Sequence, residues 1–288
     1  MSHGVKSIGI IGAGQMGGGI TQVAATAGID AVVYDSSTDQ LKKCEALHQK
    51  LLNRAVEKER MTQAEADAAL GRISYANSLD ALSGSDWVVE AIIEDLGIKS
   101  DLFKKLAAML PNDNVVLASN TSSISITALA ASAGDAAHRV VGMHFFNPVP
   151  IMKLVEVIKG IQTSDDVVDR TVALAEAMGK TPLKANDRAG FVSNRVLMPL
   201  INEAFYAWME GVAEPEAIDG IMKLGCNHPM GPLRLADFIG LDTCEHIMNV
   251  LHRELGSDKY APCPLLKQLV SAGRLGDKTK RGVYDYSN

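Results

Sequence analysis

The sequence has few aromatic residues, few cysteines and no long apolar run. Phenylalanine, tryptophan and tyrosine together make up 5% of its 288 residues, too few for the stacking platforms that bind single-stranded nucleic acid. Acidic residues number 34 and lysine plus arginine 28, which gives a net charge of −6. A nucleic-acid binder usually carries a basic footprint, so we expect no nucleic-acid partner.

The four cysteines are too widely spaced for the pairing that is typical of zinc sites, so we expect no metal. They indicate free thiols in a reducing compartment. No stretch reaches the roughly 18 apolar residues that a transmembrane helix needs. The apolar run Ile8 to Ile11 is broken at once by glycine, unlike a signal peptide. These absences predict a cytoplasmic protein that does not bind membranes.

Short β-branched runs alternate with helical patterns through the first part of the chain. We expect strands at residues 8–11, 31–34, 87–90, 115–118, 140–143 and 154–158, and helices at 17–27 and from 38 to about 70. The strand runs are continuously apolar, as in strands that are buried on both faces. Strand, helix and strand in series predict an α/β fold with a Rossmann-type, mostly parallel sheet.

The last hundred residues show helical spacing and only one short strand-like run, at 282–284. Pro199 falls inside one helical pattern and should kink that helix or mark its start. The pattern changes within the polar stretch 184–190. We therefore expect two domains, a cofactor-binding domain at 1–187 and an all-α domain at 188–288.

Residues 12–17, GAGQMG, fit the pattern G-x-G-x-x-G directly after an expected strand and at the start of an expected helix. The first glycine permits a tight turn, the second lets the backbone approach a pyrophosphate, and the third lets helix and strand pack closely. An ordinary glycine turn is the alternative. The residues expected to contact the cofactor here are Gly12, Gly14, Gln15, Met16 and Gly17.

Asp35 ends the second expected strand, 21 residues after Gly14. A carboxylate at this place can accept hydrogen bonds from both ribose hydroxyls and would repel a 2′-phosphate. It therefore favours NAD over NADP as the cofactor.

A polar cluster, residues 119–123, directly follows the strand expected at 115–118. Ligands of open parallel sheets bind at the carboxyl ends of strands, so the Asn120 amide and the Ser122 hydroxyl are candidate contacts to a cofactor or substrate. A serine here can equally cap a helix, and the residues alone leave both readings open.

His144 ends the next apolar run, and Glu156 lies within the strand that follows. Burying a glutamate among leucine, valine and isoleucine is costly unless it is paired, and a histidine is its natural partner. A carboxylate that orients an imidazole makes it a competent general base near neutral pH. A core histidine bonded to the backbone is the alternative.

The segments at 141–150 (VGMHFFNPVP) and 152–157 (MKLVEV) resemble the signature of the 3-hydroxyacyl-CoA dehydrogenase family. The resemblance extends over essentially the whole chain, and the length matches the short, single-function bacterial members. It also covers the glycine loop, 119–123, 190–195 (GFVSNR), 227–232 (NHPMGP), 278–279 and 282–284.

This resemblance implies a role for each matching residue. His144 corresponds to the base that takes the proton of the 3-hydroxyl, and Glu156 to the carboxylate that orients it. Asn194 matches an amide that holds the thioester or the 3-oxygen, and Ser122 a serine that contacts the reacting oxygen and the nicotinamide region. Further matches to cofactor contacts are Glu94, Lys99, Asn147 and Lys278.

Lys50, Arg54 and Lys58 recur every four residues on an expected helix, so they form one basic stripe. Such a stripe can bind the phosphates of coenzyme A, and Arg54 and Lys58 match substrate-binding lysines of bacterial relatives. A solvated charged face is the alternative.

These observations predict an NAD-dependent dehydrogenase that interconverts (3S)-3-hydroxyacyl-CoA and 3-oxoacyl-CoA, with 3-hydroxybutyryl-CoA as the expected substrate. The same chemistry on another substrate, such as 3-hydroxyadipyl-CoA, is the main alternative, and a cofactor-binding sensor without catalysis is a third. The helical domain resembles the family's dimerisation domain, so we expect a homodimer.

Overall fold

The computed structural model describes residues 4–287. The chain forms two compact units, Met1–Asp187 and Arg188–Asn288. Each unit has its own cluster of buried apolar side chains and therefore its own hydrophobic core.

The first unit is built on one eight-stranded sheet with the order β3-β2-β1-β4-β5-β6-β7-β8. Neighbouring strands are parallel except for β6 and β7, which are antiparallel. The order reverses at β1, which lies between β2 and β4, and such a switch point is where open α/β sheets bind ligands. The strands are β1 (Ser7–Ile11), β2 (Asp30–Tyr34), β3 (Ile73–Ala76), β4 (Trp87–Glu90), β5 (Val116–Ser119), β6 (Val140–Phe145), β7 (Leu154–Lys159) and β8 (Thr181–Asn186).

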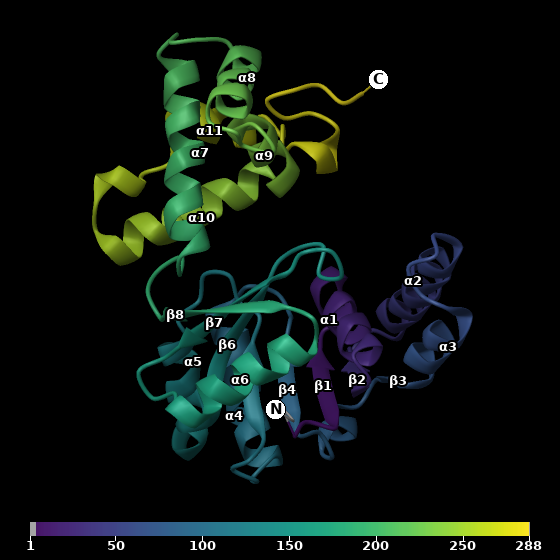
Figure 1. The fold of residues 1–288 in the computed structure, drawn as a ribbon. Coiled ribbons are helices and arrows are strands. Elements are labelled where there is room, and N and C mark those ends of the chain that lie inside the picture. The colour runs from purple at the N-terminus through teal and green to yellow at the C-terminus, as the bar shows by residue number, and fades with distance from the viewer. Residues whose placement is uncertain (1–3, 288) are drawn as a thin grey trace. The chain divides into compact units, whose positions relative to one another are not determined.

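Helices cover both faces of this sheet (Figure 1). They are α1 (Gln15–Thr26), α2 (Thr38–Glu57), α3 (Gln63–Gly71), α4 (Leu96–Met109), α5 (Ile126–Ser132) and α6 (Asp165–Ala177), with short 3₁₀ helices at Leu79–Leu82 and Gly134–Arg139. Side chains of α1 and α6 join one buried cluster with alternate residues of the central strands, such as Trp87 and Val89. The prediction of an α/β, mostly parallel Rossmann-type sheet is confirmed.

Two strands were not expected from the sequence. They are β3 and β8, which form the two edges of the sheet. In β8 every residue is at least partly exposed, so it lacks the continuous apolar run that marked the central strands.

The helical region expected from residue 38 to about 70 is two helices rather than one. Helix α2 ends at Glu57, and α3 begins after Thr62, whose side chain accepts a hydrogen bond from the Glu65 N–H. The Glu65 carboxylate accepts one from the Thr62 N–H in return. This reciprocal capping box starts a new helix and interrupts the pattern.

The second unit is helical. It contains α7 (Ser193–Met209), α8 (Pro215–Gly225), α9 (Pro232–Ile239), α10 (Leu241–Leu255) and α11 (Pro264–Ser271), with short 3₁₀ helices at Asp258–Tyr260 and Asp277–Thr279. Its core includes Phe205, Leu233 and Leu251. Pro199 lies inside α7, beyond its first turn, rather than at its start.

Two buried aspartates fix the chain in this unit. Asp219 accepts hydrogen bonds from the N–H groups of Leu233 and Arg234, both at 2.8 Å, and so caps the start of α9. Asp237 accepts from the N–H groups of Val283 and Tyr284. The strand expected at 282–284 is therefore not a strand, because the Val283 and Tyr284 N–H groups bond to a side chain and the Gly282 N–H bonds to the Tyr284 carbonyl instead of a neighbouring strand.

Candidate active site

The glycine loop joins β1 to the start of α1, and two of its glycines are required by packing within the protein. A Cβ atom on Gly12, which has a φ of +103°, would lie 2.5 Å from the carbonyl oxygen of Ala91. One on Gly17 would lie 1.8 Å from the carbonyl oxygen of Gly12. A Cβ on Gly14 would meet nothing within 4 Å. Gly14 therefore leaves the backbone open on the side where the pattern predicts a pyrophosphate.

The N-terminus of α1 adds to this opening. Its N-cap is Gly14, which supplies no side-chain hydrogen bond to the first turn, and no acidic residue lies in that turn. Uncapped N–H groups at a helix N-terminus attract anions. A dinucleotide pyrophosphate fits this arrangement, with the N–H groups of Gln15, Met16 and Gly17 as its natural donors.

Asp35 holds the loop at the end of β2. One of its carboxylate oxygens accepts from the Ala13 N–H and the other from the Ser37 N–H, both at 2.9 Å. Gln40, in the first turn of α2, donates its amide N–H to the Ala13 carbonyl at 2.8 Å. Gln40 was not predicted, since no motif marks it, but with Asp35 it clamps both polar backbone groups of Ala13.

Glu94 organises the polar cluster that follows β5. Its Oε1 atom accepts hydrogen bonds from the Ser122 and Ser123 N–H groups, at 2.9 and 3.0 Å, and from the hydroxyls of Thr121, Ser122 and Ser123. Burial alone would raise the pKa of the Glu94 carboxyl. The charge of Lys99 and the hydrogen bonds from this cluster outweigh that effect and lower the pKa below its usual value.

Lys99 is buried between two carboxylates. Its ammonium lies 2.5 Å from Glu90 and 3.3 Å from Glu94. The second oxygen of Glu90 accepts from the Ser119 hydroxyl at 2.6 Å. Glu90 was not predicted, although a glutamate at the end of an apolar strand is the same signal that singled out Glu156. The network links the ends of β4 and β5 to the start of α4.

The amide of Asn120 ties the end of β5 to the end of β6. Its oxygen accepts from the Phe145 N–H at 2.9 Å. Phe145 directly follows His144, so this bond fixes the backbone beside the histidine. Asn147 follows β6 and is exposed.

His144 and Glu156 face each other directly across the antiparallel pair β6 and β7. Nδ1 of His144 lies 2.7 Å from Oε2 of Glu156, and the two residues are 8% and 3% exposed. An imidazole whose Nδ1–H donates to a carboxylate has Nε2 as its basic nitrogen. The Phe146 ring lies beside the imidazole, with centroids 4.7 Å apart. The pair can therefore accept and return a proton while Glu156 stabilises the imidazolium.

The remaining predicted site residues lie elsewhere. Asn194 lies at the start of α7 and is buried. Lys278 is in the second unit, where its ammonium lies 2.6 Å from Oδ2 of Asp242.

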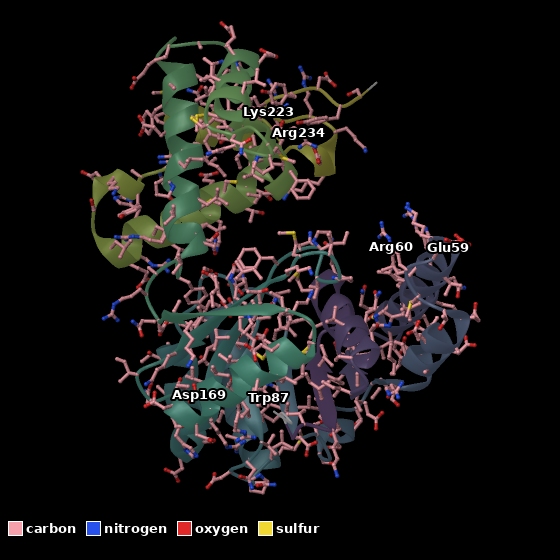
Figure 2. The ribbon with its side chains drawn as sticks, viewed as in Figure 1. Glu59, Arg60, Trp87, Asp169, Lys223 and Arg234 are labelled. Atoms are coloured by element: carbon pink, nitrogen blue, oxygen red, sulfur yellow. The ribbon has the colours of Figure 1, made fainter. Side chains whose placement is uncertain are left out.

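Lys50 and Arg54 are exposed on α2, and the exposed Lys58 is its C-cap. Figure 2 labels Glu59 and Arg60, which continue the charged surface beyond this end of α2. A basic stripe in this position is accessible to the phosphates of a large anionic ligand.

Within residues 4–287, no three histidine, cysteine or acidic side chains are grouped so that they could hold a metal ion. No helix in that range is both long and apolar enough to span a membrane.

A loop that leaves its backbone open to a pyrophosphate, on the sheet that carries a buried histidine–carboxylate pair, defines the class of the chain as a dinucleotide-dependent dehydrogenase. Residues 7–188 match the family model for the 3-hydroxyacyl-CoA dehydrogenase NAD binding domain, and residues 190–286 match that for the C-terminal domain. The chain belongs to the 3-hydroxyacyl-CoA dehydrogenase family.

Similar proteins cover almost the whole chain. It is 57% identical to a probable 3-hydroxybutyryl-CoA dehydrogenase of Deinococcus radiodurans, over 96% of this chain and 99% of that protein. It is 53% identical to a protein of the same name from Bacillus subtilis, over 98% of each. A crystal structure of the (S)-3-hydroxybutyryl-CoA dehydrogenase of Ralstonia eutropha is similar with a TM-score of 0.95 at 48% identity, over 99% of this chain and 100% of that one.

The different surroundings of Gly14 and Gly17 predict different effects of an alanine substitution at each position. Gly17→Ala should destabilise the fold by at least about 2 kcal/mol, because its Cβ would overlap a backbone carbonyl. Gly14→Ala should change the free energy of unfolding by less than about 0.5 kcal/mol, since its φ of −71° suits alanine. It should nevertheless weaken NADH binding at least about tenfold, because the methyl group occupies the open side. Urea unfolding and NADH fluorescence titration measure these effects, and a Gly14→Ala protein that binds NADH normally would contradict the assignment.

The environment of Glu94 predicts a pH-dependent contribution to stability. Because its pKa is lowered in the folded protein, the carboxylate stabilises the fold above the usual glutamate pKa of about 4.3, and this contribution is lost as the pH falls through the lowered value. Glu94→Gln should reduce the free energy of unfolding at pH 7 by about 1–3 kcal/mol. Below about pH 4, the free energies of unfolding of Glu94→Gln and the unmodified protein should differ by less than they do at pH 7.

Urea unfolding at both pH values tests this prediction, with Glu176→Gln as the control because Glu176 is exposed on α6. A deficit in Glu94→Gln that stays the same at both pH values would show that the carboxylate charge is not responsible.

Proposed function

We propose that the protein interconverts (3S)-3-hydroxybutyryl-CoA and acetoacetyl-CoA, with NAD as the hydride acceptor. The observation that carries the proposal is the buried His144–Glu156 pair, which lies across two strands of the sheet that also carries the glycine loop. The names of the similar proteins support the substrate. Asp35, at the end of β2, supports NAD over NADP because its carboxylate would repel a 2′-phosphate.

In the direction of oxidation, Nε2 of His144 accepts the proton of the 3-hydroxyl as the C3–H bond breaks and the C3 ketone forms. Bound NAD supplies the chemistry of hydride acceptance. Glu156 keeps Nδ1 protonated and stabilises the imidazolium that results. In the reverse direction the imidazolium returns the proton to the oxygen on C3.

Two further side chains are proposed to bind the oxygen atoms of the substrate. The Ser122 hydroxyl donates to Glu94 at 3.3 Å, and we propose that it turns to donate to the oxygen on C3 when the substrate binds. Asn194 is proposed to hold the thioester or the same oxygen. Donors held beside the reacting oxygen stabilise the negative charge that develops on it.

The proposed cofactor contacts beyond the glycine loop are Glu94, Asn120, Asn147 and Lys278. For Lys99 we propose an indirect role through Glu94, because its ammonium is buried between two carboxylates. The exposed stripe of Lys50, Arg54 and Lys58 is proposed to bind the phosphates of coenzyme A.

We also propose that residues 1–187 bind NAD and that the helical residues 188–288 are a substrate and dimerisation domain, which forms a homodimer. Exposed apolar side chains on α8, Ile221 at 62% and Leu224 at 90%, support a partner surface on the second unit.

The function is tested by following NADH absorbance with acetoacetyl-CoA and, separately, with free acetoacetate at equal protein concentration. We expect rapid loss of absorbance with the thioester only, because free acetoacetate lacks the coenzyme A phosphates that the basic stripe is proposed to bind. His144→Gln should lower kcat by about 10²–10⁴-fold while NADH still binds.

The matched control is His138→Gln, since His138 is an exposed histidine of the same unit and should leave the rate unchanged. Activity with free acetoacetate alone would contradict the coenzyme A assignment. Turnover of longer or dicarboxyl thioesters, such as 3-oxoadipyl-CoA, in place of acetoacetyl-CoA would keep the chemistry and reject the short-chain substrate.

A further inference from the structure

Lys180 is a buried lysine between α6 and β8, and it is 8% exposed. Its ammonium donates to the backbone carbonyls of Val149 and Met152, the latter at 2.8 Å. The N–H of the next residue, Thr181, donates to the carbonyl of Lys153 at 2.8 Å. Two consecutive residues therefore hold the segment 146–153, which joins β6 to β7.

The segment also packs against α1. Val149 is 2% exposed, and a Cβ atom on Gly19 would lie 2.8 Å from its Cβ. Gly19 lies one turn beyond the N-terminus of α1, where we place the pyrophosphate. Lys180 and the cofactor helix therefore both hold this segment.

The segment also lies next to the residues assigned to chemistry. It begins two residues after His144 and contains Asn147, and it ends three residues before Glu156. A shift of the segment would move Asn147 directly and would loosen the ends of both strands that carry the catalytic pair.

Burying a charged side chain costs desolvation free energy. Burial, together with the charge of Lys153, lowers the pKa of Lys180, so the folded protein disfavours this ammonium relative to water. An apolar side chain of similar length would avoid that cost, but it would leave the carbonyls of Val149 and Met152 without these donors. Lys180 therefore contributes by holding the segment 146–153 in a fixed position through these two carbonyls.

We infer that Lys180 is a positioning residue of the dehydrogenase, which fixes the segment 146–153 against α1 and thereby holds Asn147 for the cofactor. The inference rests on the proposed function for its link to turnover. Its link to cofactor binding rests on the match to the NAD binding domain and on the proposed cofactor contact of Asn147.

The test compares Lys180→Met with Lys184→Met. Lys184 is the control because it is an exposed lysine of β8 that pairs with Asp169 at 2.6 Å. For Lys180→Met we expect NADH to bind about tenfold more weakly, with KM for acetoacetyl-CoA changed by less than about twofold. Amide hydrogen exchange should become faster in 146–153 and stay unchanged in α4. Lys184→Met should match the unmodified protein in all three measurements.

Normal NADH binding in Lys180→Met, or equal weakening in both variants, would overturn the inference. Failure of the unmodified protein to turn over acetoacetyl-CoA would refute the proposed substrate instead, and NADH binding and hydrogen exchange would still decide the role of Lys180.

A second variant covers the case in which Lys180→Met does not fold. Lys180 borders a cavity of about 380 Å³ whose wall includes Leu52, Met61 and Met178, so small amines have access to the site. Ethylammonium should restore NADH binding to Lys180→Ala at least about fivefold and leave Lys184→Ala unchanged. Folded Lys180→Ala that binds NADH normally, or that does not respond to the amine, would overturn the inference.

Discussion

A glutamate in the middle of a buried strand needs a hydrogen-bond partner, and this requirement determines how β6 and β7 pair. Glu156 finds its partner in His144, directly opposite on β6. Residues opposite each other in an antiparallel pair point to the same face, and a slip of one residue would turn Glu156 to the other face. The single antiparallel step in the sheet thus places an oriented imidazole where the proposed reaction needs a base.

The same physical rule governs the neighbouring strands. Glu90 and Glu94 are carboxylates near the end of β4, and each is stabilised by donors from the next loop or helix. Their bonds to Lys99, Ser119 and the Ser122 loop join the ends of β4 and β5. Asn120 extends this connection to β6. These bonds hold the ends of β4, β5 and β6 in place before the substrate arrives, and such support keeps the proposed site residues in a fixed geometry.

The sequence predicted the features that follow from local patterns. The central strands were apparent as apolar runs, and the loop at 12–17 as a glycine motif between a strand and a helix. Glu156 stood out because a carboxylate among apolar residues demands a partner.

Features that depend on tertiary contacts were not predictable. The edge strand β8 is partly exposed throughout and so resembles a loop in sequence. Gln40 and Lys180 act on backbone carbonyls far along the chain, and a carbonyl carries no sequence signal. The break between α2 and α3 could have been predicted, since Thr62 and Glu65 have the spacing of a capping box.

The most direct test of the central claim is a double-mutant cycle on the His144–Glu156 pair, with kcat for reduction of acetoacetyl-CoA as the readout. If Glu156 acts through His144, removing both groups should cost no more than removing the histidine alone. We therefore expect His144→Gln with Glu156→Gln to retain the same residual kcat as His144→Gln. A double variant whose loss is the product of the two single losses would show that the two residues act independently, and would contradict the assignment of one oriented base.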